Sequence, residues 1–284
     1  MTKSELILKL DDWKKDLKYN EKSEKTIITY VGDIQKFLDF ITDDNRKITK
    51  DDLINYKIQL KEKDHLKESS ISRKIISLNK FFSFCDIDFK VKNIKVQSKS
   101  TLENLLTEKE LKGILKQCEQ QKEAMIYLMV KTLTLTGIRY NELQYITVEA
   151  CKEKKVKIDN KGKIREIPLE AGLCKDLLQY AKSQNINTGM LFITKHGTFI
   201  KNEQFTRKLK KVAGKAHFIK LSKVHPHAFR HFFALNLLET VNNNMAVVAD
   251  ILGHSSLETT RIYLKTSMNE QRKHIKEMTK KLNI

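Results

Sequence analysis

Residues 225–231 read His225-Pro226-His227-Ala228-Phe229-Arg230-His231, and this short stretch decides how the rest of the chain is interpreted. Proline suits the first turn of a helix, where its missing N–H leaves no bond unmade. On a helix that starts here, His227 and Arg230 are three residues apart and therefore share a face. Together the two side chains can grip an oxyanion such as a phosphate, because both can donate to its oxygens.

The same stretch also has the spacing of a zinc site, because His227 and His231 are four residues apart. Arg230 lies beside them and would repel a cation, and no third ligand is obvious. We therefore do not expect a zinc site here.

A second arginine follows the predicted end of a helix in residues 136–143, TGIRYNEL. Apolar residues over 123–136 predict a helix that Gly137 ends with a left-handed cap. Arg139 then lies close to the backbone, and Glu142 is placed to fix its guanidinium through charge-assisted hydrogen bonds. Taken alone, this pair is an ordinary surface ion pair.

Residues 252–263, LGHSSLETTRIY, have the pattern of two helices joined at a glycine. Gly253 closes the first helix, and a capping box opens the second, which carries Tyr263 about two turns in. His254 follows the glycine. A lone tyrosine on a helix is usually a packing residue, and a lone histidine after a glycine is usually a surface residue.

Strands are expected only between the first and second arginines. Residues 145–148, 155–158 and 164–169 are rich in β-branched residues and alternate in polarity. Residues 159–162, Asp-Asn-Lys-Gly, are a hairpin-turn signal between the last two strands, within the longer string KGKIREIPL at 161–169. Helical periodicity returns afterwards, over 170–183, 202–214, 226–241, 244–252 and 256–265, before a charged terminal helix.

The first hundred residues have the pattern of short amphipathic helices that open at Ser23, Thr49 and Ser70. On the third of these helices Arg73 and Lys74 lie off the apolar face, which suits either a solvated surface or a face that meets DNA. Residues 93–106 are polar and aperiodic, and we expect them to link a domain at 1–92 to a domain at 107–284.

Composition supports a helix-rich protein with an anionic partner. The 284 residues include only 9 glycines and 2 prolines, which excludes collagen-like and low-complexity classes. The net charge is +19, of which +5 falls on residues 1–99 and +14 on residues 100–284. A balance this basic favours nucleic acid as the partner, although a lysine-rich surface alone would also give it.

Other classes receive no support. None of Cys85, Cys118, Cys151 and Cys174 forms a C-x-x-C pair, which argues against zinc-ribbon and thioredoxin-like folds. The first residues contain no long apolar segment, and no apolar run is long enough to span a bilayer. We expect a protein of the cytoplasm, associated with the nucleoid.

Taken together, TGIRYNEL, KGKIREIPL, HPHAFRH and LGHSSLETTRIY resemble the tyrosine recombinase (phage integrase) family. The strings SEKTIITYVGDIQKFLDFI (23–41) and SSISRKIISLNKFFSFC (69–85) are similar to its core-binding domain, so the resemblance covers nearly the whole chain. It implies a mainly α fold with a small antiparallel sheet. A helical, SAM-like core-binding domain (1–92) and an α+β catalytic domain (107–284) would form a clamp on DNA.

The resemblance also implies a reaction, in which a tyrosine cuts DNA through a 3′-phosphotyrosyl bond without ATP, metal or any other cofactor. Glu142 would support the cluster without reacting, and Lys161 is close enough to compete with Lys163 for the role of general acid. The implied catalytic set is Arg139 and Arg230 on the phosphate, His227 as base, Lys163 as acid, His254 as a further donor and Tyr263 as nucleophile.

The implied partner is double-stranded DNA with inverted-repeat core sites. Its expected contacts are Arg73, Lys74, Thr206, Arg207 and Lys210. The family assembles as a tetramer on two sites by exchanging a C-terminal helix, here about 268–284 with Ile275, Met278 and Leu282 as its apolar stripe. The alternative is that this helix packs on its own domain.

We expect no separate arm-binding domain, because 284 residues match the two domains described above. This favours a resolvase of transposon cointegrates or replicon dimers, such as the TnpI-type resolvase of a Tn3-family transposon, or an Xer-type chromosome dimer resolvase. A DNA-binding regulator that has lost catalysis and a type IB topoisomerase-like enzyme remain as alternatives.

Overall fold

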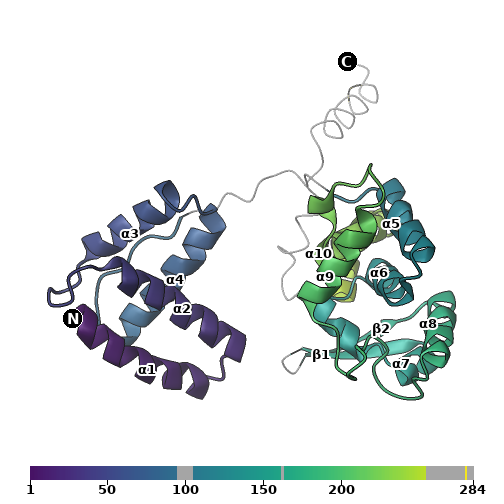
Figure 1. Cartoon of the computed structure of the whole chain (residues 1–284), viewed down its shortest axis with the longest axis horizontal. Helices are drawn as coiled ribbons and strands as arrows, with labels where there is room; N and C mark the ends of the chain where they lie inside the picture. The colour runs from purple at the N-terminus through teal and green to yellow at the C-terminus, as the bar shows by residue number, and fades with distance from the viewer. Residues whose placement is uncertain (95–104, 161–162, 254–278, 280–284) are drawn as a thin grey trace. The chain divides into compact units, whose positions relative to one another are not determined.

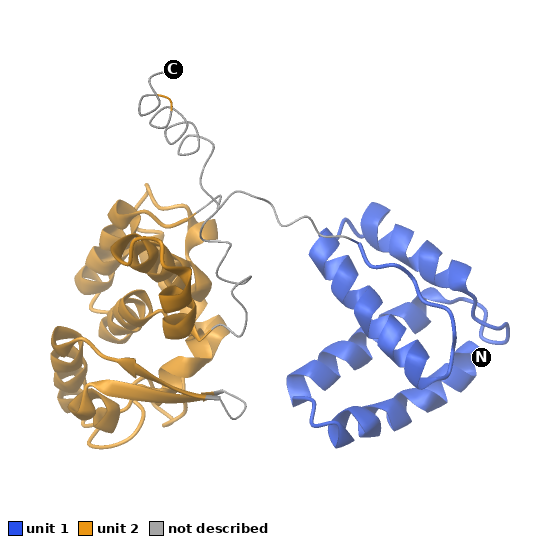
Figure 2. Cartoon of the chain, turned by 180° about the vertical axis from the view of Figure 1, so that it is seen from behind, with its two compact units in different colours: residues 1–98 blue, residues 99–284 orange. Residues whose placement is uncertain are grey.

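The computed structural model describes residues 1–94, 105–160, 163–253 and 279. The chain divides into two compact units, residues 1–98 and residues 99–284, coloured separately in Figure 2. Both units are mainly helical, and the described residues contain one two-stranded antiparallel sheet. The expected fold class is therefore confirmed. None of the described helices is long and apolar enough to cross a membrane.

The first unit consists of four helices around an aromatic core. They are α1 (Lys3–Tyr19), α2 (Glu24–Phe40), α3 (Lys50–Glu62) and α4 (Glu68–Phe84). Helix α4 begins two residues before the predicted start at Ser70. In the core the Trp13 ring lies against Phe81, with 5.0 Å between centroids, and Phe37 meets Phe82 edge-on at 5.7 Å. These buried rings hold the helix faces together.

The second unit is built around α6, which contacts α5, α8, α9 and α10 (Figure 1). Its N-terminal elements are α5 (Glu108–Gln120), α6 (Ala124–Thr136), a 3₁₀ helix η1 (Tyr140–Tyr145) and α7 (Val148–Glu153). Strands β1 (Lys155–Asn160) and β2 (Lys163–Pro168) follow. The remaining elements are α8 (Ala171–Ser183), α9 (Asn202–Ala213), a 3₁₀ turn η2 (Leu221–Lys223), α10 (Pro226–Thr240) and α11 (Met245–Leu252).

The two strands form the predicted hairpin, with Lys155 paired to Pro168 at one end and Asn160 to Lys163 at the other. The prediction of a strand at 145–148 is wrong. The 3₁₀ helix η1 ends at Tyr145, and Thr147 makes only an isolated bridge to Met190 before α7 begins. The Thr147 side chain accepts the Ala150 N–H at 3.1 Å and so caps α7, which explains why this β-branched run is not a strand.

Two glycines end helices in the left-handed conformation that the sequence predicted for Gly137. Gly137 has φ +62° after α6, and Gly253 has φ +62° after α11. Neither position has room for a side chain, because a Cβ at Gly137 would overlap the Phe233 ring and one at Gly253 would overlap the Arg165 guanidinium. The helix predicted over 256–265 lies outside the described residues, as does the terminal helix except for Thr279.

Candidate active site

Arg230 is a buried arginine that joins three segments of the second unit. Its side chain leaves α10 one turn after Pro226, and the residue is 4% exposed. One Nη donates to the carbonyl oxygen of Gly137 and the other to that of Leu252, at 2.8 Å. Carbonyl oxygens carry no net charge, so these two bonds fix the guanidinium without neutralising it.

Arg139 approaches the same place from the loop after α6. Its Nη1 donates to Glu142 Oε1 at 3.0 Å, and its backbone N–H donates to Glu142 Oε2 at 2.7 Å. Its Nη2 lies 3.4 Å from the carbonyl oxygen of Gly253, next to the carbonyl that Arg230 holds. The predicted pair of Arg139 and Glu142 is thus present in the structure. The Arg139 side chain remains 34% exposed and can reach a ligand.

The loop that carries Arg139 is anchored on its other side by Tyr140. The buried Tyr140 hydroxyl donates to the carbonyl oxygen of Ile200 at 2.6 Å, and its ring packs on Phe199 and Phe205. This places the arginine loop beside the start of α9. Both ends of the loop are therefore fixed, by Gly137 against Phe233 and by Tyr140 against α9.

His227 lies on α10, one turn before Arg230. Partial desolvation lowers the pKa of His227 below its usual value, and the positive charges of Arg230 and Arg139 lower it further. A histidine held neutral at pH 7 can accept a proton. The three residues therefore combine two fixed cations with one available base.

Two more histidines surround His227. The pKa of His231 is lowered to about 4, chiefly by burial and then by the charges of His227, His225 and Arg230. Burial also lowers the pKa of His225, with smaller effects from His227 and Lys210. Within the described ranges, no group of three or more His, Cys, Asp or Glu side chains is arranged to hold a metal ion.

Sequence reasoning missed Arg165, which lies on β2. Its Nη2 donates to Glu142 Oε2 at 2.7 Å, and its side chain is only 16% exposed. Arg165 pairs across the hairpin with Ile158, which is fully buried. Because side chains alternate along a strand, Arg165 shares its face with the buried Ile167. The sequence does contain a signal for Arg165, because it lies two residues before Ile167 and so on the same side of the strand as a buried apolar residue. The neighbouring lysines match the hairpin pattern more closely and drew the assignment instead.

Three of the expected catalytic positions cannot be placed by side-chain geometry. Lys163 is described as the first residue of β2, paired with Asn160. His254 and Tyr263 lie outside the described residues, and so does Lys161, the alternative to Lys163.

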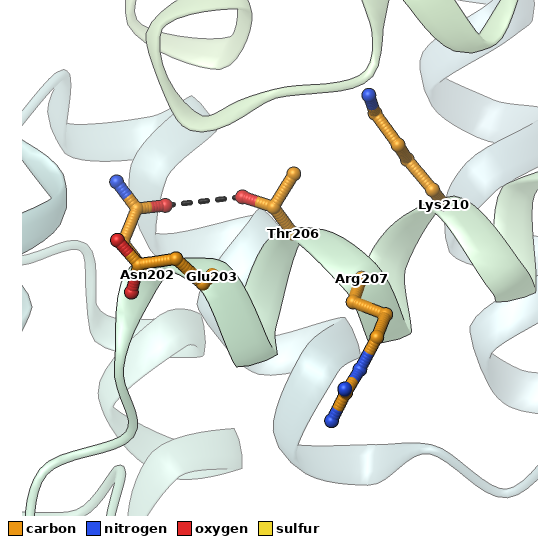
Figure 3. Close-up of a pocket in the computed structure, with 5 residues that line it drawn as sticks. All are labelled: Asn202, Glu203, Thr206, Arg207 and Lys210. Carbon is orange, nitrogen blue, oxygen red and sulfur yellow. Dashed lines mark hydrogen bonds between the residues drawn. The ribbon is translucent and has the colours of Figure 1, made fainter.

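Helix α9 carries the expected DNA contacts of the second unit. Phe205, Leu209 and Val212 bury one face of the helix, which turns the opposite face outward. The outward residues Asn202, Glu203, Thr206, Arg207 and Lys210 line a surface pocket (Figure 3). Thr206 donates from its hydroxyl to Asn202 Oδ1 at 3.0 Å. The three residues expected at DNA thus lie on one continuous surface.

The first unit corrects one expectation about its basic residues. Lys74 does not lie off the apolar face of α4 but is buried, and its ammonium donates to Asp33 Oδ1 at 3.0 Å. Asp33, on α2, also accepts from Arg73 and from Ser77. A lysine stem can be buried along apolar neighbours when its charge finds a partner, which helical periodicity alone does not reveal. Arg73 remains 45% exposed at its side chain.

Comparison with known proteins identifies the family. The model named "Phage integrase family" matches residues 104–270, and the model named "Phage integrase, N-terminal SAM-like domain" matches residues 10–85. The chain belongs to the phage integrase family. It is a tyrosine site-specific recombinase, as the resemblance implied.

Curated relatives of this recombinase span almost its entire length. A "Tyrosine recombinase" of Pseudothermotoga lettingae is 30% identical over 85% of this chain and 87% of its own. The "Tyrosine recombinase XerA" of Pyrococcus furiosus is 27% identical over 97% of this chain and 94% of its own.

Solved structures show the same fold at lower identity. XerH bound to palindromic difH substrate has a TM-score of 0.71 at 21% identity, covering 88% of this chain and 79% of that chain. A second match is the Tn1549 transposon integrase (residues 82–397) in complex with circular intermediate DNA. Its TM-score is 0.71 at 18% identity, and the match covers 98% of this chain and 100% of that chain.

In this recombinase the structure brings together Arg139, His227 and Arg230 among the expected catalytic residues. Glu142 contacts Arg139 as expected, and Arg165 reaches the same carboxylate from the hairpin.

Proposed function

We propose that this recombinase cuts and rejoins DNA through Tyr263. The Tyr263 Oη attacks a backbone phosphorus and forms an O–P bond while the bond from phosphorus to the 5′-oxygen breaks. The products are a 3′-phosphotyrosyl bond and a free 5′-hydroxyl. The reverse attack by a different 5′-hydroxyl exchanges strands, and no ATP is needed because the phosphodiester bond energy is retained.

The observation that carries this proposal is the convergence of Arg139 and Arg230 beside a neutral His227. Negative charge accumulates on the non-bridging oxygens in the pentavalent transition state, and two fixed guanidinium groups suit that charge. Loss of one such donor is expected to slow the reaction on the order of 10²–10³-fold.

Proton transfer divides between two residues. A phenol has a pKa near 10, so Tyr263 needs a base at neutral pH, and the lowered pKa of His227 supports that role. We assign protonation of the leaving 5′-oxygen to Lys163, with Lys161 as the competing candidate. His254 would donate a further hydrogen bond to the phosphate.

The polar face of α9 and Arg73 are our candidates for the DNA contacts, one from each side of a clamp. Lys74 is reassigned from DNA contact to support of Arg73, because its ammonium is satisfied by Asp33. Each lost phosphate contact should reduce the salt dependence of binding by about one counterion. Lys210→Ala is therefore expected to flatten the slope of log K against log salt by about 1, whereas Lys182→Ala on α8 should not.

At the level of biology, we propose that the recombinase resolves transposon cointegrates or replicon dimers. It would act at inverted-repeat core sites as a homotetramer on two DNA sites, with exchange of the helix at 268–284. Relatives named XerA and XerC support the closely related role of chromosome dimer resolution as the alternative. A transposon integrase shares the fold of this chain, which is compatible with a role in a mobile element.

A covalent trapping experiment tests the chemistry. Tyr263→Phe protein would first select its binding site from fragmented DNA that flanks the gene. Wild-type protein incubated with a nicked suicide duplex carrying that site should then form a protein–DNA adduct, and Tyr263→Phe should not. No adduct from the wild type, as for an inactive regulator, or an adduct from Tyr263→Phe would overturn the proposal.

A second experiment separates the enzymes that share this intermediate. A supercoiled plasmid with two copies of the site should be resolved into two circles by a recombinase. A topoisomerase-like enzyme would relax the plasmid without resolving it. For the general acid, a 5′-bridging phosphorothiolate should restore cleavage to Lys163→Ala, because the thiolate leaves without a proton, and lack of rescue would favour Lys161.

A further inference from the structure

One carboxylate in the site serves two arginines from different elements. Glu142 accepts the backbone N–H and Nη1 of Arg139, at 2.7 and 3.0 Å, and also Nη2 of Arg165, at 2.7 Å. The Glu142 side chain is only 7% exposed, so water competes little for these bonds. The orientation of Arg139 is therefore set by a carboxylate that Arg165 holds from the other side.

Arg165 also reaches the loop after α11. The absence of a Cβ at Gly253 leaves the space that the Arg165 guanidinium occupies, and a methyl group there would overlap Nη1 and Cζ. Gly253 immediately precedes His254, and its carbonyl oxygen lies 3.4 Å from Arg139 Nη2. The hairpin strand, the arginine loop and the end of α11 consequently meet at one guanidinium.

Stability alone does not account for an arginine at this position. The Nε atom of Arg165 is buried and has no hydrogen-bond partner among the described residues. Burial and the like charge of Arg139 both lower the pKa of Arg165, and Glu142 acts in the opposite direction. A whole buried ion pair can often be replaced by apolar side chains with little loss of stability, so the presence of a buried pair is weak evidence for a purely stabilising role.

We propose that Arg165 is a positioning residue for strand cleavage: through Glu142 and Gly253 it holds Arg139 and the backbone before His254 in the geometry that binds the scissile phosphate. Arg165 is mostly buried and does not itself touch the substrate. Its strand begins at Lys163, so the same residue ties the segment that carries the general acid to the phosphate-binding arginine. This inference rests on the proposed cleavage chemistry.

The test compares Arg165→Met and Arg165→Lys with wild type in single-turnover cleavage of the suicide duplex. Arg165→Met should lower the cleavage rate on the order of 10- to 100-fold, since displacement of a phosphate-binding group by about 1 Å has effects of that size. Arg165→Met leaves the buried Glu142 carboxylate with one donor fewer and should lower the melting temperature by several degrees, so cleavage is measured well below that temperature. Its affinity for the duplex should stay close to wild type. Arg165→Lys keeps one donor for Glu142 and should recover part of the rate.

Two comparisons make the result specific. Lys131→Met removes a different ion pair of the same unit, in which Lys131 Nζ lies 2.6 Å from Asp176, and should leave cleavage unchanged. In a Glu142→Gln background, Arg165→Met should slow cleavage little further, because both changes act through one carboxylate.

The outcomes separate the two proposals. Three outcomes would overturn the positioning role while leaving the assignment of the nucleophile intact. They are cleavage by Arg165→Met at the wild-type rate, a rate loss explained by a fall in melting temperature, and full additivity with Glu142→Gln. Absence of any adduct from wild-type protein would instead overturn the proposed function, and the positioning role with it.

Discussion

Arg230 Nη2 donates to the carbonyl oxygen of Leu252 at 2.8 Å, and this bond ties helix α10 to the end of α11. The companion bond, to the carbonyl oxygen of Gly137, ties the same guanidinium to the end of α6. In the proposed reaction, the two carbonyl groups that would orient Arg230 for a phosphate are therefore also the ends of two helices that pack on α10.

Arg230→Ala is therefore expected to lose both cleavage and stability. The rate of adduct formation should fall on the order of 10²–10³-fold. Two buried carbonyl oxygens lose their partner, which costs about 2–4 kcal/mol and lowers the melting temperature by roughly 5–15 °C for a unit of this size. Arg230→Lys should recover more stability than activity, since an ammonium lacks the planar fork. Wild-type melting of the alanine variant would show that these bonds do not hold the helices.

Gly137→Ala should destabilise the second unit through two separable effects. The left-handed backbone costs a non-glycine residue about 1–2 kcal/mol, and the new Cβ also meets Phe233. Gly197→Ala is the matched control, because Gly197 has φ +71° and nothing within 4 Å of an added Cβ. Thermal unfolding should show a clearly larger loss for Gly137→Ala. Equal losses would mean that the Phe233 ring moves aside without penalty.

Local chemistry explains which parts of this molecule the sequence predicted correctly. Gly137 as a helix end and Asp-Asn-Lys-Gly as a hairpin turn both depend on neighbours within a few residues, and the corresponding helix and strands are present. The pair of Arg139 and Glu142 is equally local. The failed strand at 145–148 is a case in which a capping threonine outweighed β-propensity.

What the sequence could not show was contact between distant segments. Lys74 is buried because Asp33, 41 positions away, lies opposite it on α2. Arg165 meets Glu142 and Gly253 only after the hairpin folds against η1 and α11. Periodicity reports which face of an element is apolar, but not which charged residue will find a partner inside that face.

The stability of the second unit should depend on pH through His231. Its pKa is lowered to about 4 in the folded protein, so the unfolded chain takes up a proton between about pH 6.5 and 4 while the folded chain does not. Stability is then fully present above pH 6.5 and falls as the pH falls through this window. Each tenfold difference in proton affinity between the folded and unfolded chains corresponds to about 1.4 kcal/mol of that loss.

Replacement of His231 by Gln should flatten this dependence between pH 6.5 and 4.5, measured as the midpoint of urea unfolding. Part of the slope should remain, because the pKa values of His225 and His227 are lowered as well. His217→Gln, at an exposed histidine after α9, should leave the slope as in the wild type. An unchanged slope in His231→Gln would contradict a His231 that stays neutral in the folded protein over this pH range.

In the first unit, Lys74 and Arg73 should separate stability from DNA binding, although both contact Asp33. Lys74→Met leaves the Asp33 side chain, which is only 5% exposed, with one hydrogen-bond donor fewer. This loss costs about 1–3 kcal/mol of folding free energy and lowers the melting temperature of a unit of about 100 residues by several degrees. DNA affinity measured well below that temperature should change little. Arg73→Ala removes the more exposed cation and should instead weaken binding and reduce its salt dependence, with a smaller effect on melting. The reverse pattern, in which Lys74→Met weakens binding and Arg73→Ala does not, would show that the buried lysine becomes exposed when the protein meets DNA.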